Sequence, residues 1–319
     1  MAGQAEVLGS AVEAARGDAT LVGVIPALVT PFHADETIDY EALGRELDFL
    51  AGHAVDWIAV GAPAEVARLG PGEVADVVAF AAERAEGRLR VLASTDLTSA
   101  RAAAAATRRL AAAGAAAILV APPDLAGARA EDLIAAFARV ALDGGLPVVI
   151  ADAPCGGGPA LPAELLARLL TGTPGVAAVR IDEAPTAPKV SRVAELLDGA
   201  PGAILGGGGP DVLHELRRGA AGTMPGPAFP ELFTSVQRLH DEGDRATAQR
   251  VLAHFLPLIT VPARSPDTFV FAQKYVLAWR GVLASTRLRT PHGPLDPRVC
   301  EELDALLEDL DLEALMAAV

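Results

Sequence analysis

The chain has 319 residues, of which 51% are hydrophobic and only 4% aromatic, so one large core of Ala, Val and Leu can form over most of its length. Its net charge of −15 would repel a polyanion, which excludes the basic surface that nucleic-acid binding requires. No apolar run reaches the ~18 residues that cross a bilayer, so a transmembrane helix is excluded as well.

Residues 1–20 form the first segment, which we expect to be a separate helix or tail. Glu6 and Glu13 lie where a secretory signal would carry a basic start and an apolar run, so we do not expect such a signal. The two cysteines, Cys155 and Cys300, are far apart and have no metal-type spacing. Together these features predict a cytoplasmic protein with free thiols.

Eight short aliphatic runs follow, separated by helical patterns, and each is a candidate strand. They are 22–29, 57–60, 91–94, 116–123, 147–154, 176–181, 203–206 and 222–226. Their spacing of about 20 to 35 residues is the length of one βα unit, and this alternation favours a parallel sheet. The first run lacks the Gly-x-Gly-x-x-Gly turn of a dinucleotide-binding open sheet. We therefore predict an α/β fold, a (β/α)₈ TIM barrel, over residues 21–227.

Helix signals lie between the strands. Asp39 and Ser99 can cap the helices that follow them, and Pro162 suits a first helical turn. Beyond the eighth strand the pattern changes to helices alone, at 230–243, 245–259, 267–283 and 297–317. We therefore predict that residues 228–319 hold the last barrel helix and a C-terminal helical bundle.

Carboxylates follow several of the predicted strands. In a TIM barrel the active site lies at the C-terminal ends of the strands, so these side chains are expected on one rim. They are Glu65, Asp96, Asp124, Asp152 and Asp182. Such oxygen ligands could hold Mg²⁺, but rim carboxylates are often solvated or cap helices, and we predict no metal site and no cofactor.

An ordered set of motifs is spread along the chain. It comprises GVIPALVTPF at 23–32, a Gly-x-x-x-Glu turn at 61–65, VAPP at 120–123 and Pro154 after the fifth strand. With the C-terminal helices, this set resembles the dihydrodipicolinate synthase / N-acetylneuraminate lyase superfamily over about residues 22–310. The resemblance implies a TIM barrel, usually a tetramer. In active members it also implies an aldolase or lyase that acts on pyruvate or another 2-oxo acid through a lysine Schiff base.

Several positions depart from the family's pattern. The Schiff-base lysine falls on Arg180 and the catalytic tyrosine on Ala151. The family's paired threonines fall on Ala62 and Pro63. The aromatic residues after its paired prolines fall on Asp124 and Leu125, and its arginine after strand five falls near Gly156. Because a guanidinium stays charged and is a poor nucleophile, Arg180 excludes imine formation at that position.

The other amines and phenols of the chain lie on predicted helices. The two lysines, Lys189 and Lys274, are expected away from the strand ends, where a lysine is usually solvated or ion-paired. Tyr40 and Tyr275 are also expected on helices. Schiff-base chemistry through an unexpected lysine therefore remains only a third hypothesis for the function.

Arg180 has two interpretations. It could bind a ligand's carboxylate or phosphate through parallel hydrogen bonds, or it could pair with a neighbouring carboxylate. The candidate partners are Glu65, Asp152, Asp182 and Glu183. The glycines at 206–209 are equally open, because their N–H groups could bind phosphate at a helix start or they could form a tight turn. Cys155 is interpreted as a loop thiol because no histidine is predicted nearby.

The predicted function is that of a dihydrodipicolinate synthase-family protein that cannot form the lysine Schiff base and is a non-catalytic or strongly altered paralogue. The alternative is an imine-independent lyase or dehydratase for a 2-oxo or sugar acid, with rim carboxylates as acid–base groups. The candidate ligand-binding residues are Arg180, Glu65, Asp96, Asp152, Gly206 and Gly207. We expect a small anionic ligand and a homo-oligomer, either a dimer or tetramer of this chain or an assembly with an active homologue.

Overall fold

The structure is a computed structural model that describes residues 21–61, 65, 68–122, 128–154 and 160–310. The predicted N-terminal helix or tail at 1–20 lies outside the described residues. Within the described part, no helix is both long enough and apolar enough to cross a membrane.

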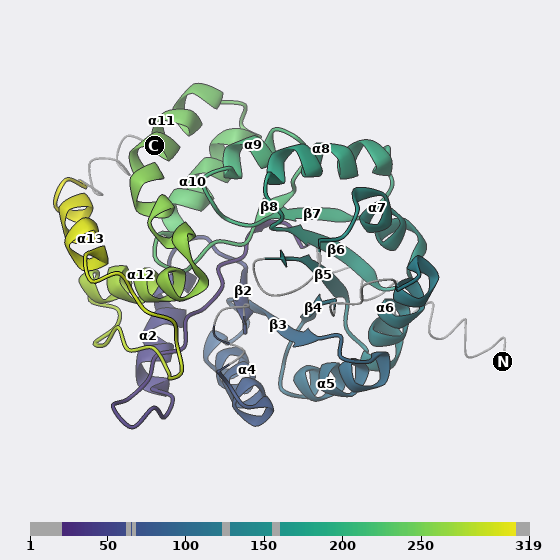
Figure 1. Cartoon of the computed structure of the whole chain (residues 1–319), viewed down its shortest axis with the longest axis horizontal. Coiled ribbons are helices and arrows are strands. Elements are labelled where there is room, and N and C mark those ends of the chain that lie inside the picture. The colour runs from purple at the N-terminus through teal and green to yellow at the C-terminus, as the bar shows by residue number, and fades with distance from the viewer. Residues whose placement is uncertain (1–20, 62–64, 66–67, 123–127, 155–159, 311–319) are drawn as a thin grey trace.

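The described residues form a barrel of eight parallel strands with helices around it (Figure 1). The strands are β1 (Gly23–Val24), β2 (Trp57–Val60), β3 (Arg90–Asp96), β4 (Ala117–Ala121), β5 (Val148–Asp152), β6 (Val176–Ile181), β7 (Ala203–Gly206) and β8 (Gly222–Thr223). Their order in the sheet is β1-β8-β7-β6-β5-β4-β3-β2. A parallel bridge between Ala27 and Ala59 joins the two ends of the sheet. The predicted TIM barrel is thus confirmed.

The first and last strands are shorter than the sequence predicts. Prolines explain the difference, because Pro26 and Pro225 have no N–H to donate to a neighbouring strand. Isolated backbone bonds still continue the pairing, since the Ala27 N–H donates to the Pro225 carbonyl at 2.7 Å. The β1–β8 pairing thus extends past the two strands, and the barrel closes between β1 and β2 through the Ala27–Ala59 bridge.

Seven helices in the described residues follow the strands around the barrel: α2 (Tyr40–Ala51), α4 (Pro71–Ala85), α5 (Ala100–Ala112), α6 (Ala130–Gly144), α7 (Ala163–Gly172), α8 (Thr186–Leu197) and α9 (Val212–Leu216). Two of the predicted caps are present. The Asp39 carboxylate accepts the Ala42 N–H at 2.9 Å, and the Ser99 hydroxyl accepts the Ala102 N–H at 3.2 Å. Each cap satisfies a backbone N–H in the first turn of its helix and so marks where that helix begins.

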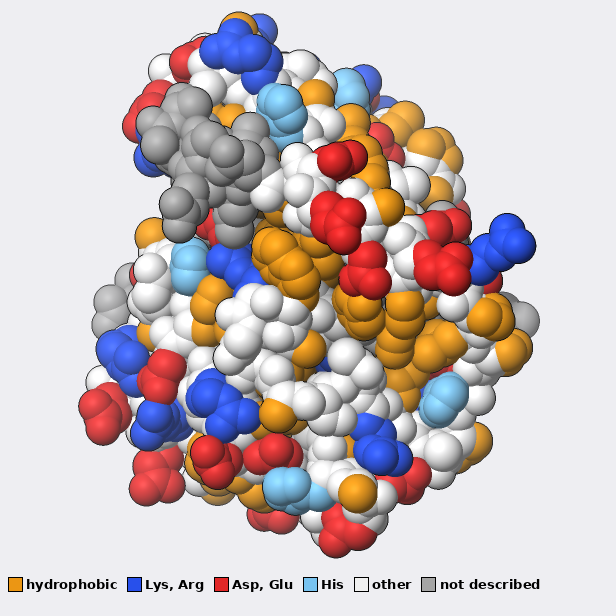
Figure 2. Space-filling model, turned by 90° about the vertical axis from the view of Figure 1, so that its left-hand side faces the viewer, with side chains coloured by type: hydrophobic (Ala, Val, Ile, Leu, Met, Phe, Trp, Pro, Cys, Tyr) orange, Lys and Arg blue, Asp and Glu red, His pale blue; other side chains and the backbone are white. Residues whose placement is uncertain are grey.

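The C-terminal region is helical, as predicted. Its described elements are α10 (Pro230–Asp241), α11 (Arg245–Thr260), the 3₁₀ turn η2 (Pro262–Arg264), α12 (Pro266–Trp279) and α13 (Val299–Glu308). Figure 1 shows α11, α12 and α13 gathered at one side of the barrel. Figure 2 views that side and shows hydrophobic side chains gathered across its middle, with charged ones around them.

The core has two parts. The first fills the barrel, with Trp57 among many smaller side chains such as Ala151 and Ala178. The second packs the strands against the helices. Alternate residues of one strand belong to different parts, because successive strand side chains point to opposite faces. This alternation decides which strand-end residues reach the mouth of the barrel.

Candidate functional site

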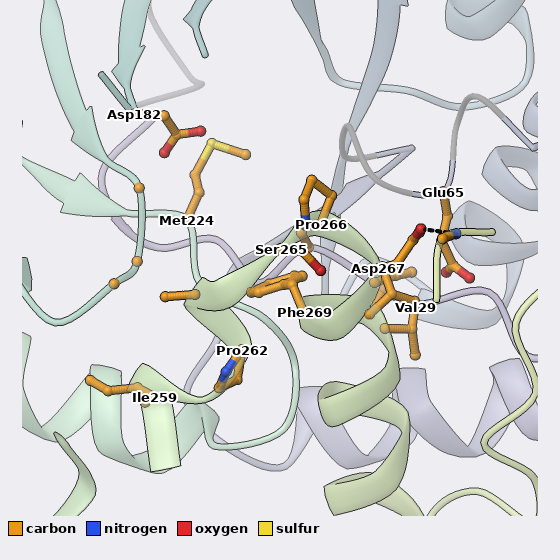
Figure 3. A pocket seen from close by; sticks show the side chains of 18 of the residues that line it. Val29, Glu65, Asp182, Met224, Ile259, Pro262, Ser265, Pro266, Asp267 and Phe269 are labelled. Carbon is orange, nitrogen blue, oxygen red and sulfur yellow. Dashed lines mark hydrogen bonds between the residues drawn. The ribbon is translucent and has the colours of Figure 1, made fainter. Parts of the chain in front are cut away.

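The carboxyl ends of the strands open into a pocket of about 630 Å³. The barrel contributes the turns after β1 and β2 and the segments that end β6, β7 and β8. The C-terminal region contributes the end of α11, η2 and the start of α12. Figure 3 shows Asp182 at one side of the pocket, Glu65 and Asp267 at the opposite side, and Pro266 and Phe269 between them.

Arg180 lies near the end of β6 and lines this pocket. Arg180 is two residues after Ala178 on the strand, so both side chains are on the same face, and Ala178 faces the barrel interior. The guanidinium is therefore directed to the mouth of the barrel. The side chain is only 10% exposed, and Nη2 lies 2.7 Å from Oδ2 of Asp182. Among the described residues, Nε and Nη1 have no hydrogen-bond partner. Two donors of this buried guanidinium are therefore not matched by an acceptor among the described residues.

The expected pairing of Arg180 with a carboxylate is observed for Asp182. Burial raises the pKa of the Asp182 carboxyl, and the charge of Arg180 opposes that rise. Glu215 on α9 is buried nearby, and burial raises the pKa of its carboxyl to about 7, with further repulsion from Asp182 and Asp211. Asp182 and Glu215, two carboxyls with a raised pKa, thus lie close to Arg180. Arg180 is the only arginine on this side of the pocket among the described lining residues.

Three of the four glycines at the end of β7 and just after it have a structural requirement for glycine. A Cβ at Gly206 would collide with Oε2 of Glu215, and one at Gly207 would collide with Oδ1 of Asp182. Gly208 has φ +77°, a left-handed conformation that favours glycine. The tight-turn interpretation therefore has a direct structural reason, and the helix that follows is only five residues long.

Lys274 is the second buried cation at the mouth. Its Nζ donates to Glu65 Oε1 at 2.7 Å, to the Thr30 carbonyl at 2.6 Å and to the Arg287 carbonyl at 2.9 Å. All three ammonium protons are thereby used. Burial lowers the pKa of Lys274, while the charge of Glu65 opposes this shift. The expected ion pair is confirmed, but the expected distance from the strand ends is wrong, because the side chain reaches from α12 to the turns after β1 and β2.

Lys189 on α8 also reaches a strand end, contrary to expectation. Its Nζ lies 2.6 Å from Oδ2 of Asp152 and also contacts the Glu183 carboxylate. The other oxygen of Asp152 accepts the Leu161 N–H at 2.8 Å. Burial raises the pKa of the Asp152 carboxyl, and its hydrogen bonds to Leu161 and Lys189 oppose that rise.

The predicted convergence of the carboxylates on one rim is only partly observed. Glu65 and Asp182 line the pocket, whereas Asp152 faces the helices because it alternates with the inward-facing Ala151. Asp96 ends β3 and is exposed. Among the described residues, no group of three His, Cys, Asp or Glu side chains could hold a metal ion.

Other predicted positions fall elsewhere. Several predicted positions lie outside the described residues: Ala62, Pro63, Asp124, Leu125, Cys155 and Gly156. Ala151, the expected tyrosine position, is buried and pairs in register with Arg180. The phenol of Tyr275 donates to Asp304 at 2.7 Å in the C-terminal region.

Sequence reasoning missed an apolar wall of the pocket. Its residues come from the barrel and from the C-terminal helices: Val29, Met224, Ile259, Pro262, Phe269 and Val270. The C-terminal helices carry no polar motif that would mark them as part of a site. Glu215 was also missed, although a carboxylate between apolar helix residues, in Val-Leu-His-Glu-Leu, is a signal of a buried acid.

Comparison with known proteins identifies the family. The model of the dihydrodipicolinate synthetase family matches residues 20–310. The chain belongs to this family. The expected relationship, inferred above from the motifs, is therefore confirmed together with the barrel fold.

Relatives in this family cover nearly the whole chain. The 4-hydroxy-tetrahydrodipicolinate synthase of Acidobacterium capsulatum is 31% identical over 298 residues, which are 92% of this chain and 96% of the relative. The enzyme of the same name from Xanthomonas axonopodis pv. citri is 34% identical over 235 residues, 72% of this chain and 76% of the relative.

Solved structures of the family are also similar. Dihydrodipicolinate synthase of Rhodopseudomonas palustris has a TM-score of 0.83 and 27% identity, covering 91% of this chain and 98% of that one. YagE, a prophage protein of E. coli K12 from the dihydrodipicolinic acid synthase family solved in complex with pyruvate, has a TM-score of 0.83 and 25% identity. That match covers 92% of this chain and 100% of YagE.

Proposed function

We propose that this protein is a dihydrodipicolinate synthetase family member that binds a small carboxylate through Arg180 and does not form a lysine Schiff base with it. The observation that carries the proposal is the buried guanidinium on the pocket wall, with two nitrogens that no described residue engages. A planar guanidinium matches a carboxylate bidentately. The pyruvate complex of YagE supports a 2-oxo acid as the ligand class.

The state of the lysines supports the proposed absence of imine chemistry. The resemblance puts Arg180 at the family's lysine position, and a guanidinium is a poor nucleophile. The amine of Lys189 is held between the carboxylates of Asp152 and Glu183, and Lys189 is not among the described residues that line the pocket. Burial lowers the pKa of Lys274, but its side chain is 0% exposed and its three donors are engaged, so a carbonyl carbon cannot approach it.

A second candidate function is an imine-independent lyase or dehydratase. The observation that favours it is Asp182, whose carboxyl borders the pocket beside Arg180 and has a pKa raised by burial. Such a group can take a proton from the carbon next to a carbonyl, while the cation stabilises the charge that develops on oxygen. Arg180 has the same binding role in both candidates.

The first experiment tests for the imine. The protein is incubated with pyruvate and borohydride, and its intact mass is measured. We expect no mass increase, whereas a reduced adduct on Lys189 or Lys274 would contradict the proposal. Calorimetric titration with pyruvate then compares the wild type with Arg180→Met, which should weaken binding at least tenfold.

The second experiment separates the two candidate functions. Proton NMR follows the methyl signal of pyruvate in D₂O in the presence of the protein. A binder without acid–base chemistry leaves that signal unchanged, whereas enolisation replaces the methyl protons with deuterium. If exchange occurs, Asp182→Asn should abolish it while pyruvate still binds, because the amide cannot accept the proton.

A further inference from the structure

We propose that the ligand carries an aliphatic or aromatic body of about six to eight carbons on its carboxylate head, an inference that rests on the proposed function and narrows its substrate class. The head binds at Arg180, and the body lies along the apolar wall defined above. Neither pyruvate nor a polyhydroxylated sugar acid has this combination of groups.

The size of the pocket is the first reason. A volume of about 630 Å³ has room for on the order of 20 non-hydrogen atoms, at the roughly 30 Å³ that each water molecule occupies in the liquid. A three-carbon 2-oxo acid bound at Arg180 would fill only about a third of that space. The remainder must be filled by the rest of a larger ligand or by water.

The chemistry of the wall is the second reason. Phe269 and Val270 on α12, with Ile259 and Pro262 before them, form one side of the pocket. Met224, after β8, lies on the barrel side in Figure 3. An apolar body placed between these side chains would remove apolar surface from water on both partners, which favours binding.

The state of the other polar side chains is the third reason. Both oxygens of Glu65 are engaged, by Lys274 and by the Thr30 N–H. Asp267 pairs with Arg68 and accepts the Gly293 N–H at 2.6 Å. The Ser265 hydroxyl caps α12 by accepting the Thr268 N–H at 3.1 Å.

These engaged groups leave Asp182 as the described lining carboxylate that could accept a hydroxyl, and one such group cannot match the several hydroxyls of a sugar acid. A buried hydroxyl without a partner opposes binding, because it loses its hydrogen bonds to water. Arg180 is the one described lining side chain with buried nitrogens that have no partner, namely Nε and Nη1. The described pocket therefore favours one anionic head and an apolar body.

The experiment compares three ligands by calorimetric titration of the full chain: pyruvate, 2-oxooctanoate and gluconate. We expect 2-oxooctanoate to bind at least tenfold more tightly than pyruvate, and gluconate to bind no more tightly than pyruvate. A ratio below tenfold for 2-oxooctanoate, or a preference for gluconate, would overturn the inference.

Two variants locate the apolar body. Phe269→Ala removes part of the wall, and Ala263→Asn puts an uncharged polar group on an exposed lining position of η2, where folding is little affected. Each should remove most of the advantage of 2-oxooctanoate and leave the pyruvate Kd within threefold. Ala105→Asn, on an exposed position of α5 outside the pocket, is the matched control and should change neither Kd. Retention of the full advantage in both wall variants would overturn the inference.

The outcomes also separate this inference from the proposed function. If Arg180→Met leaves every Kd unchanged, or if no 2-oxo acid binds, the proposed function fails and the inference fails with it. If pyruvate binding depends on Arg180 and the longer chain adds nothing, only the inference fails.

Discussion

Two buried cations at the barrel mouth differ in how completely the protein satisfies them. The three protons of Lys274 are matched by three acceptors, from Glu65, Thr30 and Arg287. Arg180 makes one ion pair, and two of its nitrogens have no partner among the described residues. Both side chains are nine-tenths buried or more, so burial alone does not distinguish them.

The difference assigns distinct roles to the two sides of the mouth. Lys274 joins α12 to the turns after β1 and β2, which fixes the C-terminal helices over the barrel. Arg180 lies on the pocket wall and keeps two buried nitrogens without a partner among the described residues, and the proposed function assigns them to a ligand. A fully matched buried ion indicates architecture, and an incompletely matched one indicates binding, because an unpaired buried donor opposes folding.

The largest expected effect on the stability of the protein comes from a substitution of Lys274. Lys274→Met leaves the carboxylate of Glu65 buried without its cation, so the free energy of unfolding should fall by about 3–5 kcal/mol. Urea unfolding near neutral pH measures this change. The double variant with Glu65→Gln should recover part of the loss, because the buried charge is then removed. A single variant within about 1 kcal/mol of the wild type would contradict the structural role.

The next effect concerns Glu215, beneath the Arg180 side. Burial raises the pKa of its carboxyl to about 7, so the folded protein holds this proton more tightly than the unfolded chain. That contribution to stability is fully present below the ordinary pKa of 4.5 and is lost as the pH rises through 7. The wild type should therefore lose about 2–3 kcal/mol relative to Glu215→Gln between pH 5 and pH 8.

Urea unfolding of both proteins across this pH range tests the prediction for Glu215. The same substitution at Glu83, an exposed residue of α4, controls for the change from carboxylate to amide. A difference between the wild type and Glu215→Gln that stays constant from pH 5 to pH 8 would show that this carboxyl has no raised pKa.

A smaller effect is expected in the glycine turn that supports the Arg180 side. Gly207→Ala should lower the free energy of unfolding by about 1–3 kcal/mol, because its Cβ would collide with Asp182 and displace it from Arg180. Gly209→Ala is the matched control, since no atom lies within 4 Å of a Cβ there, and should stay within about 0.5 kcal/mol. Equal effects at the two glycines, measured by urea unfolding, would contradict the close packing.

The sequence predicts the strands of the barrel better than the side-chain contacts at its mouth. Aliphatic runs locate all eight strands, and alternation could have separated the outward-facing Asp152 from the inward-facing Arg180. Prolines could have predicted the short first strand. In contrast, nothing local in α12 shows that Lys274 reaches two strand ends, because that contact depends on how distant helices pack on the barrel. The apolar wall was missed for the same reason.

The smallest effect on stability is expected at Arg180 itself. Arg180→Met removes the ion pair with Asp182, but it also removes buried donors that have no partner, so the two changes largely offset each other. Asp182 borders the pocket and has a raised pKa, and can therefore take up a proton once the cation is gone. We expect the free energy of unfolding to change by about 1 kcal/mol or less near neutral pH, as measured by urea unfolding. A loss as large as that of Lys274→Met would show that Arg180 is an architectural ion as well, and the contrast between the two cations would then disappear.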